Sequence, residues 1–407
     1  MSASAFLSRF DAARAVLPGD ASLREAAAGV LRARGLPGPR EEAWRYTRLR
    51  PLSEADYAMP VPGREVSLPA SVAALDAPRL VFVDGTYRAD LSVPPSKAVL
   101  RTGVPAMGPL ARPESERLVA LNTMLAADGA ELSVAAGVDA GTVVLVSLGG
   151  EGVAFHPRHA VHLARGAKLT LIEICAGEGR YLHNPVTSIT VEAGAILTHL
   201  RLQDEGIEAI HLSTIYADVA EGGTYDSFAL TIGARLARME VHARLGGTAA
   251  MAHLNAAQLL GGVQHADFTT VVTHDAPATQ SRQTVKNVLT GRSHGVFQGK
   301  IEVSRIAQKT DGYQMNQALL LSPDAEINCK PQLEIYADDV KCSHGATVGA
   351  LDADQYFYLR SRGVPAAEAR AIVVRAFLAE ALDPLAHEAG RALLENAVAG
   401  WWERHPA

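Results

Sequence analysis

A cysteine and a histidine two residues apart, Cys342 and His344, stand near the C-terminal end of the chain. If this segment is a β-strand, both side chains project from one face, about 7 Å apart along the chain. A thiolate and an imidazole on one face are suitable ligands for iron or copper ions. Two ligands do not complete a metal site, so others would have to come from elsewhere, another chain included. The alternative is a buried pair that binds no metal.

Histidines also occur at His156, His159 and His162. On a strand the first and last would share one face and the middle one would point to the other, which is not the geometry of a three-ligand site. We expect a solvated, structural role for this group. The remaining cysteines, Cys175 and Cys329, are expected to be small core residues.

Several catalytic motifs are absent from the sequence. It contains no phosphate-binding Gly-x-x-x-x-Gly-Lys-[Ser/Thr] loop, no His-Glu-x-x-His and no Cys-x-x-Cys. These absences disfavour an ATPase and a zinc protease.

The elements that would position Cys342 and His344 belong to a long middle region, residues 115–350. Short runs rich in Val, Ile, Leu and Thr alternate there with Gly-containing turns, and the runs starting at Gly166, Gly194 and Gly223 resemble one another. A fainter run starts at Gly247. Imperfect repeats of this length predict a mainly β solenoid, most simply a right-handed parallel β-helix. A β-sandwich is the competing interpretation.

The flanking regions differ from this core. Residues 1–114 are mixed and contain helical spacing, for example over residues 22–34, and residues 351–407 are helical. The C-terminal helices are apolar on more than one side, so they must pack on their own domain or on a partner.

The composition narrows the class of protein. The chain has 407 residues and a net charge of −6, with no Lys/Arg run that would indicate a nucleic-acid surface. No apolar stretch approaches the ~18 residues of a membrane span, and the N-terminus lacks signal-peptide features. Three scattered cysteines do not form a disulfide framework, so we expect a reducing compartment, the cytoplasm.

Four segments resemble the SufB/SufD family. Two of them, residues 330–349 and 355–363, are similar to its C-terminal core, and residues 41–47 and 311–322 are also family-like. The sequence Lys-Cys-Ser-His-Gly-Ala-Thr is more similar to SufD members than to SufB members, where the matching stretch usually reads Glu-His-Glu-Ala-Thr. The similarity covers nearly the whole chain.

This resemblance implies a parallel β-helix between helical ends and a non-catalytic scaffold role in a SufB–SufC–SufD complex. It implies pairing with SufB through the β-helix, binding of the SufC ATPase through the C-terminal helices, and a transient nascent iron–sulfur cluster at the SufB–SufD interface. By position, His344 matches a histidine implicated as a cluster ligand, and Cys342 a neighbouring cysteine of less certain role. Flavin binding by the assembled complex and homodimer formation without SufB stay open.

Two other classes of function remain as alternatives. Parallel β-helices also host carbohydrate-active enzymes, for which Glu173, Asp204 and Asp226 are candidate carboxylates, although nothing in the sequence fixes them on one face. A homodimeric binding protein without cluster chemistry is the third class. Assembly with SufB and SufC would distinguish the scaffold from both.

Overall fold

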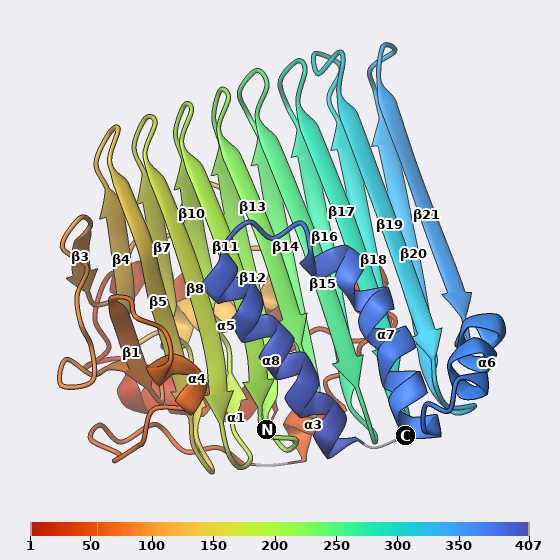
Figure 1. Ribbon diagram of the computed structural model, residues 1–407. Coiled ribbons are helices and arrows are strands. Elements are labelled where there is room, and N and C mark those ends of the chain that lie inside the picture. The colour runs from red at the N-terminus through yellow and green to blue at the C-terminus, as the bar shows by residue number, and fades with distance from the viewer. Residues whose placement is uncertain (1, 55, 406–407) are drawn as a thin grey trace.

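The computed structural model describes residues 2–54 and 56–405 of the chain. Its centre is a β-solenoid of about 8 turns over residues 129–349, with helices at both ends (Figure 1). Successive solenoid strands pair in parallel, as β11 (Ile196–Glu205) does with β13 (Thr224–Thr231). The predicted β-helix is therefore confirmed, and the β-sandwich alternative is wrong because sandwich sheets are antiparallel.

Two sheets run along the solenoid, and each turn adds one strand to each of them. Sheet 1 consists, in order of pairing, of β5 (Asp139–Gly149), β8 (Lys168–Gly177), β11, β13, β15 (Met251–Leu260), β17 (Gln280–Leu289), β19 (Asp311–Leu320) and β21 (Lys341–Gly349). Sheet 2 consists of β4 (Gly129–Val134), β7 (Arg158–Leu163), β10 (Val186–Val191), β12 (Ile210–Val219), β14 (Leu236–Leu245), β16 (His265–His274), β18 (His294–Val303) and β20 (Glu326–Ile335).

Smaller strands complete the N-terminal end of the sheets. A hairpin of β1 (Arg79–Val83) and β2 (Thr86–Tyr87) extends sheet 1 beyond β5, and β3 (Val99–Thr102) pairs antiparallel with β4 of sheet 2. The short strands β6 (Ala154–Phe155) and β9 (Leu182–His183) extend the pairing of β12. The N-terminal end of each sheet is therefore closed by an antiparallel strand.

One turn recurs along the solenoid. Two positions before each of seven sheet-1 strands, the chain has a positive φ, between +57° and +69°, at Gly137, Gly166, Gly194, Gly222, Ala249, Ala278 and Lys309. Glycine adopts this left-handed conformation without steric cost, which explains the predicted Gly repeats. The predicted starts at Gly223 and Gly247 fall beside the turn residue, because Gly222 and Ala249 occupy it.

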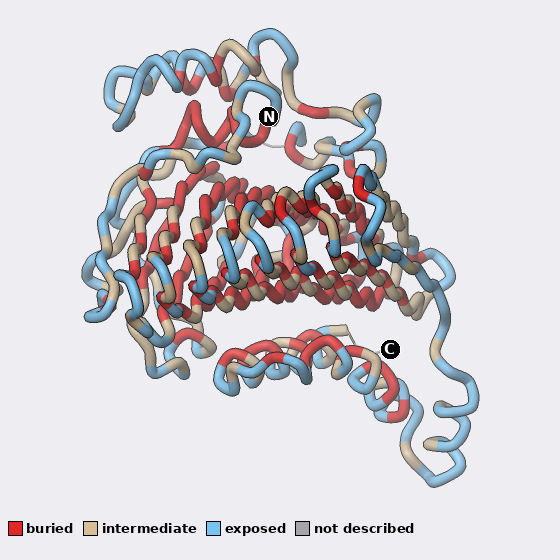
Figure 2. Tube along the Cα trace, turned by 90° about the horizontal axis from the view of Figure 1, so that it is seen from above, coloured by how far each residue is buried: buried red, intermediate tan, exposed pale blue. Residues whose placement is uncertain are grey.

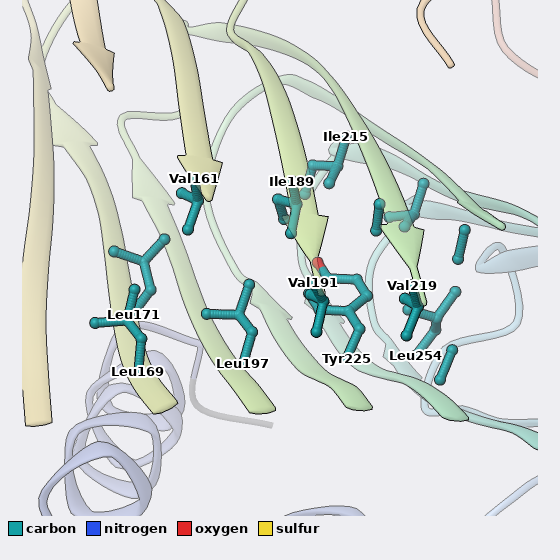
Figure 3. Packing of buried hydrophobic residues seen from close by; sticks show 14 of the residues in the cluster. Val161, Leu169, Leu171, Ile189, Val191, Leu197, Ile215, Val219, Tyr225 and Leu254 are labelled. Atoms are coloured by element: carbon teal, nitrogen blue, oxygen red, sulfur yellow. The ribbon is translucent and has the colours of Figure 1, made fainter. Parts of the chain in front are cut away.

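The interior is filled by alternate residues of both sheets. The side chains of Leu169, Leu197 and Tyr225 lie level with one another on β8, β11 and β13. They belong to a buried apolar cluster that also contains Val161 and Ile189 of sheet 2 (Figure 3). Because strand side chains alternate, the remaining residues of sheet 1 face outward and need a separate cover.

Most of the N-terminal helical elements cover the outer face of sheet 2. These elements are α1 (Ala3–Ala13), α2 (Ala21–Arg34), the 3-10 helix η1 (Glu42–Trp44), α3 (Arg50–Ser53) and α5 (Arg117–Leu125). Helix α4 (Ala70–Ala73) instead packs Val72 against outward-facing residues of sheet 1. Phe6, Phe10 and Leu31 form one apolar cluster with Leu121 of α5 and Leu212 of β12. Helix α5 occupies the beginning of the region predicted as solenoid, residues 115–350. The solenoid therefore begins only at β4.

The C-terminal helices are α6 (Ala353–Ser361), α7 (Ala366–Leu382) and α8 (Glu388–Arg404). Val374 and Leu378 of α7 and Trp401 of α8 pack against outward-facing residues of sheet 1, such as Leu200. Figure 2 shows these two helices on the opposite side of the solenoid from the N-terminal ones. Among the described residues, no helix is long and apolar enough to cross a membrane.

Candidate functional site

The C-terminal end of the solenoid has no cap. Strands β20 and β21 are the last members of sheets 2 and 1, and no described strand pairs with their outer edges. Helix α6 follows β21, but none of its residues is buried, and in Figure 1 it lies near one end of the last strands rather than along them. An unpaired edge presents free N–H and C=O groups to a partner strand.

Hydrogen bonds at the start of β20 and of β21 show which residues of these two strands face the free edge. The Lys341 N–H donates to the Thr310 carbonyl, and the Glu326 N–H donates to the Ser293 carbonyl. Bonding groups of successive residues alternate between the two edges of a strand. The backbone groups of Cys342, His344 and Ala346 therefore point to the free edge of β21.

Proline at residue 331 fits this arrangement on β20. By the same alternation its backbone nitrogen faces the free edge, where the missing N–H removes no bond to β18. The side chain lies level with Gly299 of the preceding turn. Pairing of a partner strand along β20 is thereby limited to the residues on either side of Pro331.

Cys342 and His344 lie on the inward-facing side of β21. Their register partners on β19 are Gly312 and Gln314, which occupy interior positions. Because no further turn follows, these interior positions are open at the end of the solenoid: Cys342 is half-buried and His344 is exposed. Both side chains thus lie on one accessible face, with room for ligands from another molecule.

A third interior thiol was not included in the predicted site. Cys329 of β20 lies level with Phe297, also on the inward side of the last turn, and burial raises the pKa of its thiol to about 11, against the effect of a hydrogen bond from Asn316. Burial also raises the pKa of Cys342. These thiols are protonated at neutral pH, so they would act as ligands only where a metal ion displaces the proton.

Apolar side chains surround this open end. Ile335 at the end of β20 is 39% exposed, Val348 of β21 is 55% exposed, and Tyr336 is 67% exposed. A further solenoid turn would bury the positions of Ile335 and Val348, as it does for Val303. Exposed apolar residues gathered around unpaired strand edges are typical of an interaction surface.

The candidate carboxylates of a carbohydrate-active enzyme do not come together. Glu173 points into the interior, where its carboxylate pairs with Arg201 at 2.8 Å, whereas Asp204 points outward and pairs with Arg404. Asp226 lies level with Thr198, six residues before Asp204 on β11, which corresponds to about 20 Å along the sheet. The structure therefore offers no support for this set as a catalytic site.

The histidines at the start of β7 have different surroundings from those predicted. His156 and His159 are buried, at 5% and 3% exposure, so the expectation of a solvated group is wrong for both. His156 contacts the Asn184 amide at 3.0 Å, and only His162 lies outward, 3.0 Å from Glu192. The group is dispersed and does not form a ligand set.

Comparisons with known proteins find iron–sulfur cluster assembly proteins along most of this chain. The family model described as "SUF system FeS cluster assembly, SufBD core domain" matches residues 146–377. The iron–sulfur cluster assembly protein SufD of Escherichia coli is 34% identical over 367 residues, covering 87% of this chain and 86% of that protein. A SufBD family protein of Synechocystis is 30% identical over 407 residues, covering 90% and 88%.

A chloroplast protein of Arabidopsis thaliana, ABCI7, is 32% identical over 249 residues, which is 60% of this chain and 52% of that protein. The matched core spans the solenoid turns from β5 onward and includes the last turn with Cys342 and His344. The chain therefore belongs to the SufBD family of iron–sulfur cluster assembly proteins.

Proposed function

We propose that this chain is a non-catalytic scaffold subunit that pairs with SufB through the open end of the solenoid. The observation that carries the proposal is the uncapped last turn, where unpaired edges of β20 and β21 are joined to a partly exposed apolar rim. Addition of partner strands to such edges provides backbone hydrogen bonds, and the apolar rim provides burial. A second solenoid with a similar open end is a suitable partner.

At this interface we assign His344 as an iron ligand of the nascent cluster and Cys342 as its neighbour in cluster formation. A neutral imidazole accepts iron, and a thiolate is the usual ligand of iron–sulfur clusters. The two side chains do not complete a ligand set, so SufB would contribute the others. The cluster is the cargo of the complex, and sharing its ligands across an interface allows release when the subunits move.

Helix α6 and the exposed side of α7 are proposed as the surface that binds SufC. Phe357 and Tyr358 of α6 are 72% and 58% exposed, and Ile372 of α7 is 37% exposed. Helix α8, by contrast, covers the chain's own sheet with the buried Trp401. ATP hydrolysis is assigned to SufC, because this sequence has no phosphate-binding loop. No described feature supports a flavin site, and none is proposed.

The edge of β21 gives a direct test of pairing. Ala346→Pro would remove an N–H that faces the free edge, so the bonds to β19 stay intact while a partner strand loses its contact. Co-expression with SufB and SufC followed by size-exclusion chromatography should show loss of the SufB-containing complex. The matched control, Ala346→Ser, should assemble like the unmodified chain. Equal assembly of both variants would refute pairing through this edge.

Without SufB, the same edge would pair with a second copy of the chain. Isologous pairing places β21 of one copy beside β21 of the other in antiparallel orientation. The purified chain should then elute as a dimer and Ala346→Pro as a monomer. An Ala346→Pro dimer would show that self-association uses another surface. The free thiols of Cys175, Cys329 and Cys342 fit the proposed location in a reducing cytoplasm.

A further inference from the structure

A group of metal-ligating side chains lies deep inside the solenoid, away from the open end. Cys175 of β8, His183 of β9 and His211 of β12 are all buried, and one ligand atom from each lies within 4.8 Å of the others. His183 and His211 are register partners on neighbouring strands. Cysteine and histidine donors at this separation match the ligand types of zinc and ferrous sites.

Glu205 of β11 orients both imidazoles. The His183 Nδ1 lies 3.0 Å from Glu205 Oε1, and the His211 Nδ1 lies 2.7 Å from Glu205 Oε2. A carboxylate on one ring nitrogen while the other binds the ion is the usual support of a metal-bound histidine. Within the described chain, the Nε2 atoms of His183 and His211 have no hydrogen-bond partner, and the His211 Nδ1 contacts Glu205 as an ion pair without hydrogen-bond geometry. Two buried ring nitrogens are therefore left for a ligand.

Glu205 also differs from the other buried carboxylates in its ion-pair partners. Four carboxylates are buried among the described residues: Asp84, Glu173, Glu205 and Asp267. Three of them pair with an arginine, namely Arg64, Arg201 and Arg238. Glu205, in contrast, forms ion pairs only with the two histidines in the described structure.

We propose that Cys175, His183 and His211 bind one divalent cation of the Zn²⁺ or Fe²⁺ class inside the solenoid, with Glu205 as the positioning residue. Binding replaces the thiol proton of Cys175, which leaves to solvent, and forms the metal–thiolate bond. One divalent cation, one thiolate and the Glu205 carboxylate then balance in charge. Three protein ligands leave a fourth position for water or another small ligand.

Deprotonation of Cys175 requires the cation. Metal binding and thiol deprotonation are coupled, because the thiolate is the form that binds. The occupied site should therefore lose metal as the pH falls.

This site is separate from the open end and does not rest on the proposed function. Cys175 and Cys342 lie on strands of sheet 1 that are six strand steps apart, which corresponds to roughly 29 Å across the sheet. Replacement of Cys342 or Cys329 therefore leaves the three buried ligands in place. These two cysteines provide matched controls for the replacement of Cys175.

The test measures metal retained by the full-length chain. The unmodified chain, Cys342→Ser and Cys329→Ser, produced in cells supplied with zinc or iron and treated with a weak chelator, should each retain about one metal ion per chain by mass spectrometry. Cys175→Ser and His211→Gln should each retain less than a tenth of this amount. When zinc and iron are supplied together, the metal that the chain retains shows which of them the site prefers. Equal retention by all variants, or none by the unmodified chain, would overturn the proposal.

A spectroscopic measurement on the unmodified chain tests the site even if the variants fail to fold. The unmodified chain produced with Co²⁺ should show the absorption of a thiolate bound to cobalt, and Cys342→Ser should show the same band. Glu205→Gln should keep the band but weaken Co²⁺ affinity by about 10–100-fold, as expected for a group that orients a ligand. A chain that shows no thiolate–cobalt band would contradict the assignment of Cys175.

Discussion

Replacing Asp267 with alanine should loosen the contact between the N-terminal region and the solenoid. Asp267 of β16 is 2% exposed, forms an ion pair with Arg238 of β14 and accepts a hydrogen bond from the Thr47 hydroxyl. The Arg238 guanidinium lies 4.2 Å from the centre of the Trp44 ring. The middle and the last residue of the family-like segment 41–47, Trp44 and Thr47, thus both contact one buried ion pair.

The size of the effect follows from burial. Asp267→Ala leaves Arg238, which is 1% exposed, with Glu240 at 3.0 Å as its remaining acidic partner. Removing one partner of a buried ion pair costs about 3–5 kcal/mol, and the remaining Glu240 contact places the estimate near 3 kcal/mol. The matched control is Asp11→Ala: Asp11 pairs with Arg32 at 3.3 Å, with side chains 53% and 41% exposed. Its loss should cost about 0–1 kcal/mol.

Urea unfolding, followed by tryptophan fluorescence, would measure both variants. Asp267→Ala should lower the midpoint clearly, and Asp11→Ala should leave it nearly unchanged. Limited proteolysis should also cut Asp267→Ala first near Trp44, before the solenoid is attacked. If the two variants have the same midpoint and the same cleavage pattern, the ion pair does not anchor this segment.

Three further predictions concern acid stability, partner binding and packing. Burial lowers the pKa of His159 to about 4, and its Nδ1 accepts a backbone N–H. In the unfolded chain the imidazole has a pKa of about 6.5. The lower pKa in the folded chain therefore contributes roughly 3 kcal/mol to the free energy of unfolding, a contribution that is complete above pH 6.5 and is lost as the pH falls towards 4. His159→Gln should flatten the slope of unfolding free energy between these pH values, and an unchanged slope would contradict the assignment. Phe357→Ala should weaken SufC binding at least about tenfold by calorimetry without changing the melting temperature, whereas Ile207→Ala, which replaces a residue 69% exposed elsewhere, should not. Trp401→Ala should cost about 3–5 kcal/mol by thermal unfolding because Trp401 is 0% exposed. Trp402→Ala, at a half-buried residue of the same helix, should cost less; equal losses would show that α8 is not anchored through Trp401.

The repeats were predictable only where the turn chemistry is uniform. Gly166 and Gly194 occupy the left-handed turn position, and their spacing predicted the solenoid. Further along, Ala278 and Lys309 adopt the same conformation, and the Gly signal disappears although the turn does not. Tertiary pairing of the flanking strands fixes the turn there at a local cost of about 1–2 kcal/mol per residue.

The common face of Cys342 and His344 could be predicted because strand alternation is a local property. Their accessibility could not, because it depends on where the solenoid ends. The group of Cys175, His183 and His211 was not predicted either. These residues follow no short motif and meet only because strands separated by a full turn stack in register. Cys175 was accordingly expected to be a core residue, and its burial alone agrees with that expectation.

The predicted C-terminal helices left two possibilities, packing on the chain itself or on a partner. In the structure, α7 and α8 pack on the chain itself and cover sheet 1, whereas α6 has no buried residue. A hydrophobic pattern does not reveal which apolar side meets its own domain. Deleting the chain after Asp383 would uncover the sheet around Trp401, so single substitutions on α6 are the better test of SufC binding.

The most direct test of the scaffold account is cluster assembly by the complex that contains His344→Ala. His344 is exposed, so its replacement should leave the fold and the complex with SufB and SufC intact. Anaerobic reconstitution with iron and sulfide, followed by the visible absorption of the cluster, should give clearly less cluster than the unmodified complex. The matched control Ser343→Ala, at an exposed neighbour whose side chain points to the other face, should assemble the cluster normally. Undiminished cluster formation by an intact His344→Ala complex would contradict the assignment of His344 as a cluster ligand at the open end of the solenoid.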